Sequence, residues 1–315
     1  MRVIIGLGVG VALASSVAWG QTGAAGWRRP APDVADARYG PHERNLLDLW
    51  KARSSVPSPL VVYFHGGAFR SGDKTNIPED ILRECLSAGI SVASANYRLS
   101  KDAPYPAPMR DGALAVQYLR MRAKEWNIDP GRIAGCGSSA GGGIALWVGF
   151  RDEMADPKSA DPVLRQSTRL SCVAGIGAQT SYDPRWIKSV IGGRCYQHPA
   201  LFSLFGLKPD ERDTQKAYAL YEDASALTHL NAGDPPAFLY YTESKKPLSS
   251  LSLPGAGIHH PKFGEALKEK MDKLGIECVV RHRDDYKESP PAASAKEMAE
   301  FFSRVFGRTH PARGQ

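Results

Sequence analysis

The sequence lacks several features that would indicate particular classes of protein. Its 315 residues include only five cysteines, with no C-x-x-C pair and no His/Cys cluster: Cys85, Cys136, Cys172, Cys195 and Cys278. An odd number leaves at least one thiol unpaired, and a free cysteine in a core strand behaves as a small apolar residue. We therefore expect no metal site, and no motif in the chain indicates a bound cofactor.

Clustered charge of one sign is also missing. Lys and Arg number 40 against 33 Asp and Glu, which gives a formal net charge of +7, but the basic residues are scattered. A nucleic-acid surface needs a stripe of Lys and Arg, so we expect a solvated basic surface and no nucleic-acid partner. Internal repeats and low-complexity linkers are absent as well, which favours one large domain with its own core.

Long apolar runs are absent beyond the N-terminus, where residues 1–20 have the form of a secretory signal peptide. One basic residue, Arg2, precedes an apolar stretch over residues 3–17, and small residues lie three and one positions before Gln21. The stretch is short for a membrane span, although an uncleaved anchor is the alternative. We expect an exported protein, periplasmic or secreted, without stable membrane insertion after cleavage. Residues 21–38 are interpreted as a flexible lead-in.

What the chain does contain is a G-x-S-x-G turn over residues 137–141, with Ser139 at its centre. This spacing suits a serine on a sharp strand-to-helix turn, because side chains two residues before and after it would collide. A short apolar run precedes the turn, and a longer one at residues 144–148 follows it. The pattern predicts a buried strand and then a nucleophilic serine at the N-terminus of a helix. A glycine-rich turn without catalysis is the plain alternative.

A second glycine-rich stretch lies upstream. An apolar run of strand length ends in the H-G-G-A-F sequence of residues 65–69. A strand that runs into H-G-G ahead of G-x-S-x-G is the order in which an esterase lays out its oxyanion hole. We expect Gly66, Gly67, Ala68 and Ala140 to form this hole, through backbone N–H groups that stabilise the negative oxygen of the transition state.

Residues 39–150 resemble the α/β-hydrolase fold, and within it bacterial carboxylesterases similar to feruloyl and acetyl-xylan esterases and to the hormone-sensitive-lipase group. Besides the two glycine-rich stretches, the matching pieces are Tyr39-Gly40, Leu47-Asp48-Leu49, Gly72-Asp73-Lys74, Asn96-Tyr97-Arg98-Leu99, Tyr105-Pro106-Ala107-Pro108 with Asp111, and residues 127–133. The C-terminal half matches in outline only. The resemblance implies a serine hydrolase that acts on carboxylic esters, either small molecules or esters linked to polysaccharide.

The order of apolar runs agrees with that fold class. Strands are expected at residues 90–95, 170–178, 237–241 and 276–281, and helices at 77–88, 111–126, 263–274 and 295–306. Such alternation indicates an α/β protein with a mostly parallel central sheet and helices on both faces. Within a domain spanning residues 39–308, residues 183–230 fit no regular crossover, and we interpret them as a small cap-like insert over the site.

The partners of the serine are harder to find. In this fold they follow the last two strands, acid first and histidine second. The expected positions fall near Ala256 and Tyr286, and neither residue has the required chemistry. A tyrosine does not act as a base at neutral pH without a strong pKa shift.

A swapped arrangement meets the same need, with a histidine from the first loop and a carboxylate from the second. His259 and His260 lie in the first loop, and Asp284 and Asp285 lie in the second. Both loops converge at the carboxyl edge of a parallel sheet. The swap predicts that the hydroxyl of Ser139 lies within hydrogen-bond reach of a ring nitrogen of one of the two histidines.

Other interpretations stay open. Glu243 and His282 are further residues that could complete the site. A chain that kept the serine turn but lost efficient catalysis would be a binding or accessory protein that uses the same pocket. A peptidase built on the same core is a third possibility, but the large extra domain that such enzymes usually carry is not visible here.

Overall fold

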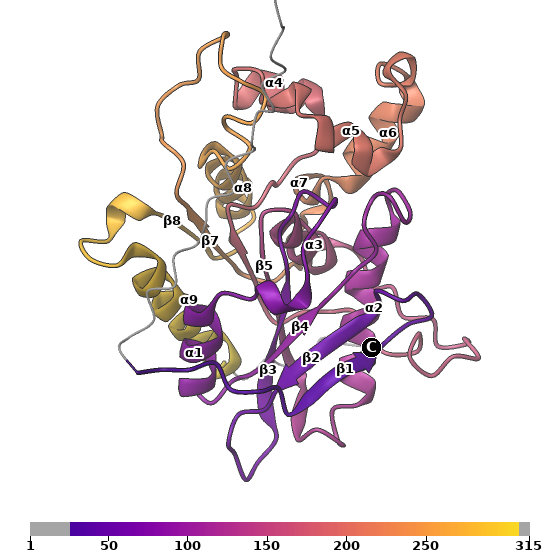
Figure 1. The fold of residues 1–315 in the computed structure, drawn as a ribbon, viewed down its shortest axis with the longest axis vertical. Coiled ribbons are helices and arrows are strands. Elements are labelled where there is room, and N and C mark those ends of the chain that lie inside the picture. The colour runs from indigo at the N-terminus through magenta and orange to yellow at the C-terminus, as the bar shows by residue number, and fades with distance from the viewer. Residues whose placement is uncertain (1–25, 309–315) are drawn as a thin grey trace, which may run out of the picture.

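An eight-stranded sheet forms the centre of the computed structural model, which describes residues 26–308 (Figure 1). The strands are β1 (Val34–Arg38), β2 (Leu46–Trp50), β3 (Ser58–Phe64), β4 (Ser91–Ala95), β5 (Ile128–Ser138), β6 (Val173–Ile176), β7 (Ala237–Tyr241) and β8 (Cys278–His282). Their order across the sheet is β1-β2-β4-β3-β5-β6-β7-β8. The pairs β1–β2 and β2–β4 are antiparallel, and every later pair is parallel. The expected fold class is confirmed.

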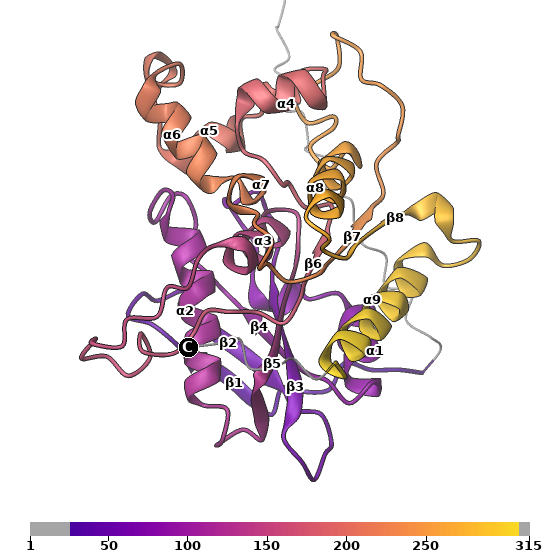
Figure 2. The same ribbon diagram turned by 180° about the vertical axis from the view of Figure 1, so that it is seen from behind.

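Helices cover both faces of this sheet (Figure 2). On one face α1 (Glu79–Ser87) packs against α9 (Pro290–Phe306), and on the other α2 (Ala107–Met121) packs against α3 (Ala140–Phe150). Helix α8 (Lys262–Lys273) joins the α2–α3 side, because its apolar residues belong to the same core cluster. The sheet is therefore the middle of three layers.

The sequence of β3 explains why both faces need a cover. Leu60, Val62 and Phe64 point to the core beneath α2 and α3, whereas Val61 and Tyr63 point to the core beneath α1 and α9. Successive side chains of a strand face opposite sides, so a continuous apolar run can be buried only between two layers of helices. All five of these side chains are almost completely buried.

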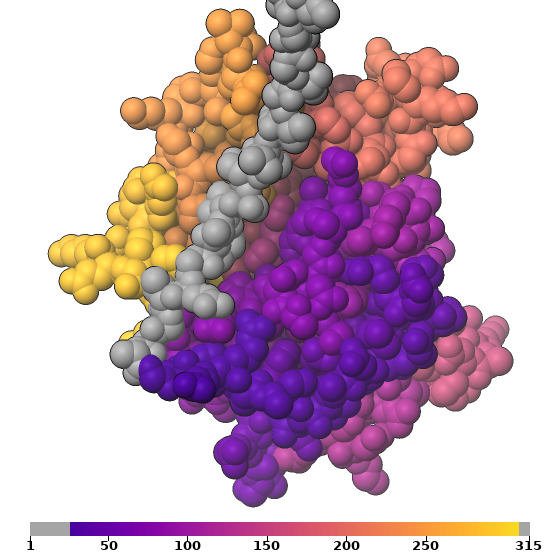
Figure 3. Space-filling model, viewed as in Figure 1, coloured from indigo at the N-terminus to yellow at the C-terminus, as the bar shows by residue number. Residues whose placement is uncertain are grey.

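A group of short helices lies beyond the carboxyl end of the parallel strands. It comprises α4 (Pro184–Val190), α5 (Pro199–Phe205), α6 (Gln215–Ala224) and α7 (Ala226–His229), and it occupies the stretch interpreted above as an insert. Figure 3 shows it at one end of the molecule, in salmon, together with the loop between β7 and α8, in orange. These two segments border the end of the sheet at which Ser139 lies.

The N-terminal expectations have different outcomes. The signal peptide assigned to residues 1–20 lies outside the described residues. The flexible lead-in expected over residues 21–38 is wrong for its last part, because Val34–Arg38 forms β1 and pairs with β2. Lys74 holds this strand through its ammonium group, which lies 3.0 Å from Asp36 and 2.7 Å from Asp48. No helix within residues 26–308 is long and apolar enough to cross a membrane.

The cysteines are core residues. All five are buried and none is paired in a disulfide. Cys136 lies within β5, and Cys278 begins β8. The thiols therefore fill space as small apolar side chains, as expected for cysteines in core strands.

Candidate active site

Ser139 occupies the turn between β5 and α3. Its φ of 50° and ψ of −119° lie in a region that side chains other than glycine rarely adopt. The turn needs glycine on both sides: a Cβ at Gly137 would overlap the backbone of Gly141, and a Cβ at Gly141 would overlap the carbonyl oxygen of Phe64. The backbone N–H of Ser139 donates to Ile176 on β6 at 2.8 Å. The strained turn is thus held between β3, through the close approach of Gly141 to Phe64, and β6, through this hydrogen bond.

The loop after β3 presents two backbone N–H groups. The ring Nδ1 of His65 donates to the carbonyl oxygen of Gly66 at 2.7 Å. The carbonyl oxygen of Gly67 accepts hydrogen bonds from the backbone N–H groups three and four residues later, at 2.9 and 3.1 Å. In a planar trans peptide the N–H points opposite to the C=O. The N–H groups of Gly67 and Ala68 therefore point away from the interior of their own loop.

This loop closely approaches the serine turn. A Cβ at Gly66 would lie 3.1 Å from the carbonyl oxygen of Ser138 and 3.5 Å from the Cβ of Ser139. Ala140 is the first residue of α3, so its N–H has no acceptor within the helix. Ala68 and Ala140 line the same pocket as Ser139. The structure therefore brings Gly66, Ala68 and Ala140 close to the serine, with Gly67 between the first two.

His65 orders the loop as a neutral ring. Its Nε2 accepts a hydrogen bond from the guanidinium group of Arg44 at 3.2 Å, which leaves the proton on Nδ1 for the Gly66 carbonyl. The ring stacks on Tyr97 with centroids 4.3 Å apart. Burial lowers the pKa of His65 to about 4, so the ring stays uncharged at neutral pH. Its proton therefore always points at the carbonyl oxygen that it orients.

His259 contacts the serine hydroxyl directly. Its Nε2 lies 2.8 Å from the Oγ of Ser139. The residue belongs to the loop between β7 and α8, and its ring lies over Gly177, where a Cβ would be 3.2 Å from the ring. The prediction that a histidine of this loop reaches Ser139 is confirmed for His259. Nε2 can accept the hydroxyl proton when Nδ1 carries the ring's own proton.

Glu243 is the carboxylate beside that ring. Its Oε1 accepts a hydrogen bond from the backbone N–H of His259 at 3.1 Å and lies 3.5 Å from Nδ1. Glu243 lies two positions after Tyr241, the last residue of β7. The three side chains of Ser139, His259 and Glu243 form a chain of contacts in which a proton can leave the hydroxyl and the resulting imidazolium faces a negative charge.

The structure does not bring the two expected aspartates to His259. After β8 the chain makes a tight turn that folds both carboxylates back on His282. The Asp284 carboxylate lies 3.1 Å from the Nδ1 of His282, and Asp285 accepts a hydrogen bond from the His282 backbone N–H at 2.7 Å. Assigning the acid to Asp284 or Asp285 is therefore wrong, because both carboxylates are engaged at the end of β8.

His260 and Tyr286 also lie away from the serine. His260 is buried, and its Nε2 donates to the carbonyl oxygen of Lys246 at 3.2 Å while its Nδ1 accepts from the Lys262 N–H at the start of α8. The side chain therefore holds the loop and the helix start, and assigning it to the serine is wrong. Tyr286 donates from its hydroxyl to Glu297 of α9 at 2.6 Å.

His282 supports the site from the last strand. The ring is buried, and its Nε2 donates to the backbone carbonyl oxygen of Glu243 at 2.7 Å. Glu243 and His282 were further alternatives on sequence grounds, and the structure joins them through this bond. The signal that could have favoured Glu243 is its place immediately beyond β7, where this fold carries its acid.

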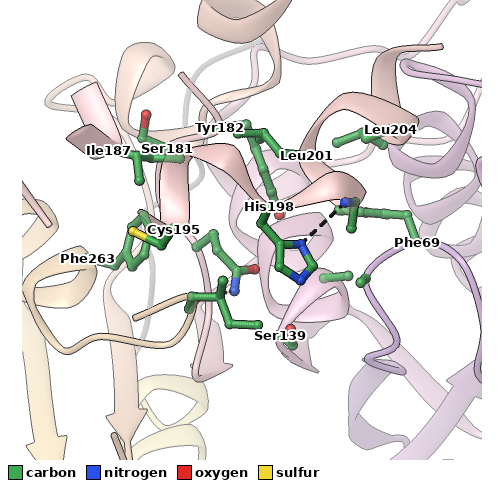
Figure 4. Close-up of a pocket in the computed structure, with 15 residues that line it drawn as sticks. Phe69, Ser139, Ser181, Tyr182, Ile187, Cys195, His198, Leu201, Leu204 and Phe263 are labelled. Carbon is green, nitrogen blue, oxygen red and sulfur yellow. Dashed lines mark hydrogen bonds between the residues drawn. The ribbon is translucent and has the colours of Figure 1, made fainter. Parts of the chain in front are cut away.

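A pocket opens beside Ser139, with a volume of about 70 Å³ (Figure 4). Its walls are mainly apolar and include Phe69, Ile187, Leu201, Leu204 and Phe263. Tyr182 and His198 add polar atoms from above Ser139 (Figure 4). Sequence reasoning missed both residues, because it carried no signal beyond their position in or beside the insert. Within residues 26–308 no three His, Cys, Asp or Glu side chains are grouped so as to hold a metal ion.

Comparison with known families and proteins shows which family the chain matches and which proteins it is similar to. The family described as BD-FAE matches residues 47–248, more than half of the 315 residues. Esterase LipI of Mycobacterium tuberculosis is 37% identical over 94 residues, which are 30% of this chain and 29% of LipI. Esterase LipQ of the same organism is 24% identical over 298 residues, 91% of this chain and 66% of LipQ. The chain thus spans less than two thirds of either relative.

Solved structures agree on the fold. An acetyl ester-xyloside bifunctional hydrolase from Caldicellulosiruptor lactoaceticus superposes with a TM-score of 0.65 at 24% identity. The match covers 82% of this chain and 88% of that protein. At this identity the likeness shows the fold alone, which is the same three-layer arrangement around a mostly parallel sheet.

Proposed function

This chain belongs to the BD-FAE family of α/β-hydrolases, and from that premise we propose that it is an exported serine hydrolase that cleaves carboxylic esters through an acyl-enzyme on Ser139. The observation that carries the proposal is the 2.8 Å contact between the hydroxyl of Ser139 and Nε2 of His259, beside the glycine loop. Relatives described as esterases support the same reaction class.

Acylation begins at the serine hydroxyl. His259 accepts the proton of the hydroxyl on Nε2 while Oγ forms a bond to the carbonyl carbon of the ester. The carbonyl oxygen becomes negative and accepts hydrogen bonds from the N–H groups of Gly67, Ala68 and Ala140. One such donor is worth about 3 to 4 kcal/mol of transition-state stabilisation in a well-formed hole.

The second half of the reaction reverses the proton path. The imidazolium of His259 gives its proton to the leaving alcohol as the carbon–oxygen bond of the ester breaks. Water then loses a proton to His259 and attacks the acyl-enzyme, and the collapse of that intermediate returns the proton to Ser139 and releases the acid. The carboxylate of Glu243 stabilises the imidazolium and orients its ring, at 3.5 Å from Nδ1.

Export and substrate type complete the proposal. The signal-peptide pattern of residues 1–20 supports passage to the periplasm or the exterior. An exported esterase meets small soluble esters and esters on polysaccharide.

A binding protein that retains the serine turn as a relic is the alternative, and the pairing of His259 with Ser139 and Glu243 argues against it. A fluorophosphonate probe separates the two, because it labels only a serine whose hydroxyl is activated. We expect labelling of the wild-type protein and none of Ser139→Ala. A folded wild-type protein that the probe leaves unlabelled would favour the relic.

A further inference from the structure

Tyr182 carries a buried hydroxyl that no protein group satisfies. The residue is 5% exposed, and its Oη has no hydrogen-bond partner among residues 26–308. Burial raises the pKa of Tyr182 well above its usual value, so the phenol keeps its proton and remains a donor. A buried donor without an acceptor is costly, and such a group in a pocket wall points to an acceptor that arrives with a ligand.

The glycine run after Ser139 makes room for this hydroxyl. A Cβ at Gly143 would overlap the Oη of Tyr182, so the oxygen lies directly against the first turn of α3. Gly143 lies three residues after Ala140, and one turn of an α-helix rises about 5.4 Å. The Oη is therefore on the order of one helical turn from the N–H group that faces the ester carbonyl. The third glycine of the run is required by the tyrosine and not by the serine.

The position of Tyr182 relative to His259 identifies which half of the ester reaches it. The leaving alcohol must face His259, whose ring lies over Gly177. Tyr182 packs instead against Phe69 of the glycine loop, with ring centroids 5.8 Å apart. The group that extends toward Tyr182 is therefore the acyl group, which stays bound to the enzyme after the alcohol has left.

The size of the pocket limits that acyl group. A volume of about 70 Å³ is less than half of the roughly 150 Å³ cavity that accommodates benzene. An aliphatic chain of a few carbons fills this volume, whereas an aromatic ring extends beyond it. Ile187 and Leu204 supply apolar walls, which suit the methyl and methylene groups of such a chain.

His198 adds a second polar group to the same pocket. Its Nδ1 accepts a hydrogen bond from the backbone N–H of Ala200 at 3.3 Å, so the proton of the neutral ring is on Nε2. Burial lowers the pKa of His198, and the nearby charges of Arg70 and His259 lower it further. Figure 4 shows the free ring nitrogen on the side that faces Ser139. Tyr182 and His198, each with a hydrogen-bond donor, thus both line a small apolar pocket.

We propose that this pocket selects short aliphatic acyl groups that carry an oxygen acceptor, such as a hydroxyl or oxo group on the third carbon, which the hydroxyl of Tyr182 binds. The inference rests on the proposed function, since it concerns the acyl half of the same ester. It assigns Tyr182 as a specificity-determining residue and Gly143 as the residue that leaves space for it.

The test compares two esters that differ by a single hydroxyl group, methyl butyrate and methyl 3-hydroxybutyrate. The readout is the ratio of their kcat/KM values, hydroxylated over plain. Tyr182→Phe removes one oxygen and keeps the ring, and we expect this ratio to fall by about three- to tenfold relative to the wild type. Tyr221→Phe is the matched control: its buried hydroxyl donates to the Arg212 carbonyl, outside the pocket, and the ratio should stay unchanged.

A second measurement on the wild type alone covers the case in which Tyr182→Phe fails to fold. The 3-hydroxybutyrate anion should inhibit the hydrolysis of p-nitrophenyl acetate at a concentration about threefold lower than butyrate does. Equal inhibition, or a ratio that Tyr182→Phe leaves unchanged, would overturn the inference and mean that water satisfies the hydroxyl. A wild-type enzyme without activity on p-nitrophenyl acetate would instead contradict the proposed function.

Discussion

Glu243 and His259 meet within a single loop: the carboxylate accepts a hydrogen bond from the backbone N–H of His259 at 3.1 Å and lies 3.5 Å from its ring Nδ1. In the proposed site the acid therefore lies in the loop after β7, and the histidine lies in the same loop. The last strand contributes only support, through the hydrogen bond from His282 to the Glu243 carbonyl oxygen. Acid and base are thus held by one segment.

Glu243 should be the carboxylate on which catalysis depends. We expect Glu243→Gln to lower kcat by about 10²- to 10⁴-fold with little change in KM, because the neutral amide no longer stabilises the imidazolium of His259. Steady-state kinetics with p-nitrophenyl acetate measure the effect. Asp285→Asn is the matched control, since Asp285 contacts His282 and not His259, and it should retain near wild-type kcat. If Asp285→Asn lost activity and Glu243→Gln retained it, the acid would instead be a carboxylate of the second loop, as the swapped arrangement predicts.

The adjacent histidines should differ sharply. His259→Ala removes the base and should lower kcat by about 10³-fold or more. His260→Ala removes a buried ring that joins Lys246 to the start of α8, so it should cost about 1 to 3 kcal/mol of stability. Kinetics and urea unfolding of both variants separate the two roles. If His260→Ala lost more activity than His259→Ala in folded protein, our assignment of the base would be wrong.

The sequence predicts well those structural features that depend on a few neighbouring residues, and less well those that depend on contacts between distant segments. The strand over residues 237–241 and the serine turn were predicted where they occur, because apolar runs and glycine spacing act within a few residues. The carboxyl edge of the sheet was predicted as the meeting place of the partner loops, which made His259 and His260 the two candidate bases. Helix ends were less well placed: the helix expected at residues 111–126 spans Ala107–Met121.

The partner of His259 could not be chosen from the sequence. Glu243, Asp284 and Asp285 all lie near the ends of the last strands, and only the path of each loop decides which carboxylate reaches the ring. In the turn after β8, both aspartates contact His282. Whether such contacts form depends on the side-chain geometry of the turn, which the pattern of residue types does not show. Tyr182 was missed for a related reason. Its hydroxyl lies against Gly143, which belongs to a different segment of the chain, and no sequence motif connects the two segments.

The serine turn should tolerate no added methyl group. Gly141→Ala places a Cβ against the carbonyl oxygens of Phe64 and of His65, which are backbone atoms of β3 and of the loop after it. We expect a loss of about 3 kcal/mol or more in the free energy of unfolding, because rigid backbone atoms must move. Gly255→Ala is the control, since nothing lies within 4 Å of a Cβ at that position. Equal unfolding midpoints in urea for the two variants would contradict the packing described for the turn.

His65 should make the stability of the fold depend on pH. Its pKa is about 4 in the folded protein, against 6.5 for a solvated ring, because burial disfavours the charged form. Between these values the unfolded chain binds more protons than the folded one, so stability is complete above pH 6.5 and falls as the pH decreases toward 4. The loss from this residue should reach about 2 kcal/mol between pH 6.5 and pH 5.

The variant His65→Asn tests this dependence, because asparagine cannot titrate but keeps an N–H donor that can bind the Gly66 carbonyl oxygen. Urea unfolding at several pH values should show a flatter curve for the variant than for the wild type. His42→Asn makes the same exchange at a partly exposed position and should keep the wild-type slope. The oxyanion loop depends on the neutral ring, since a protonated His65 would turn its Nε2–H toward the guanidinium of Arg44. Activity should therefore decline together with stability over this pH range. If the stability of His65→Asn fell with pH as steeply as that of the wild type, a group other than His65 would control the pH dependence.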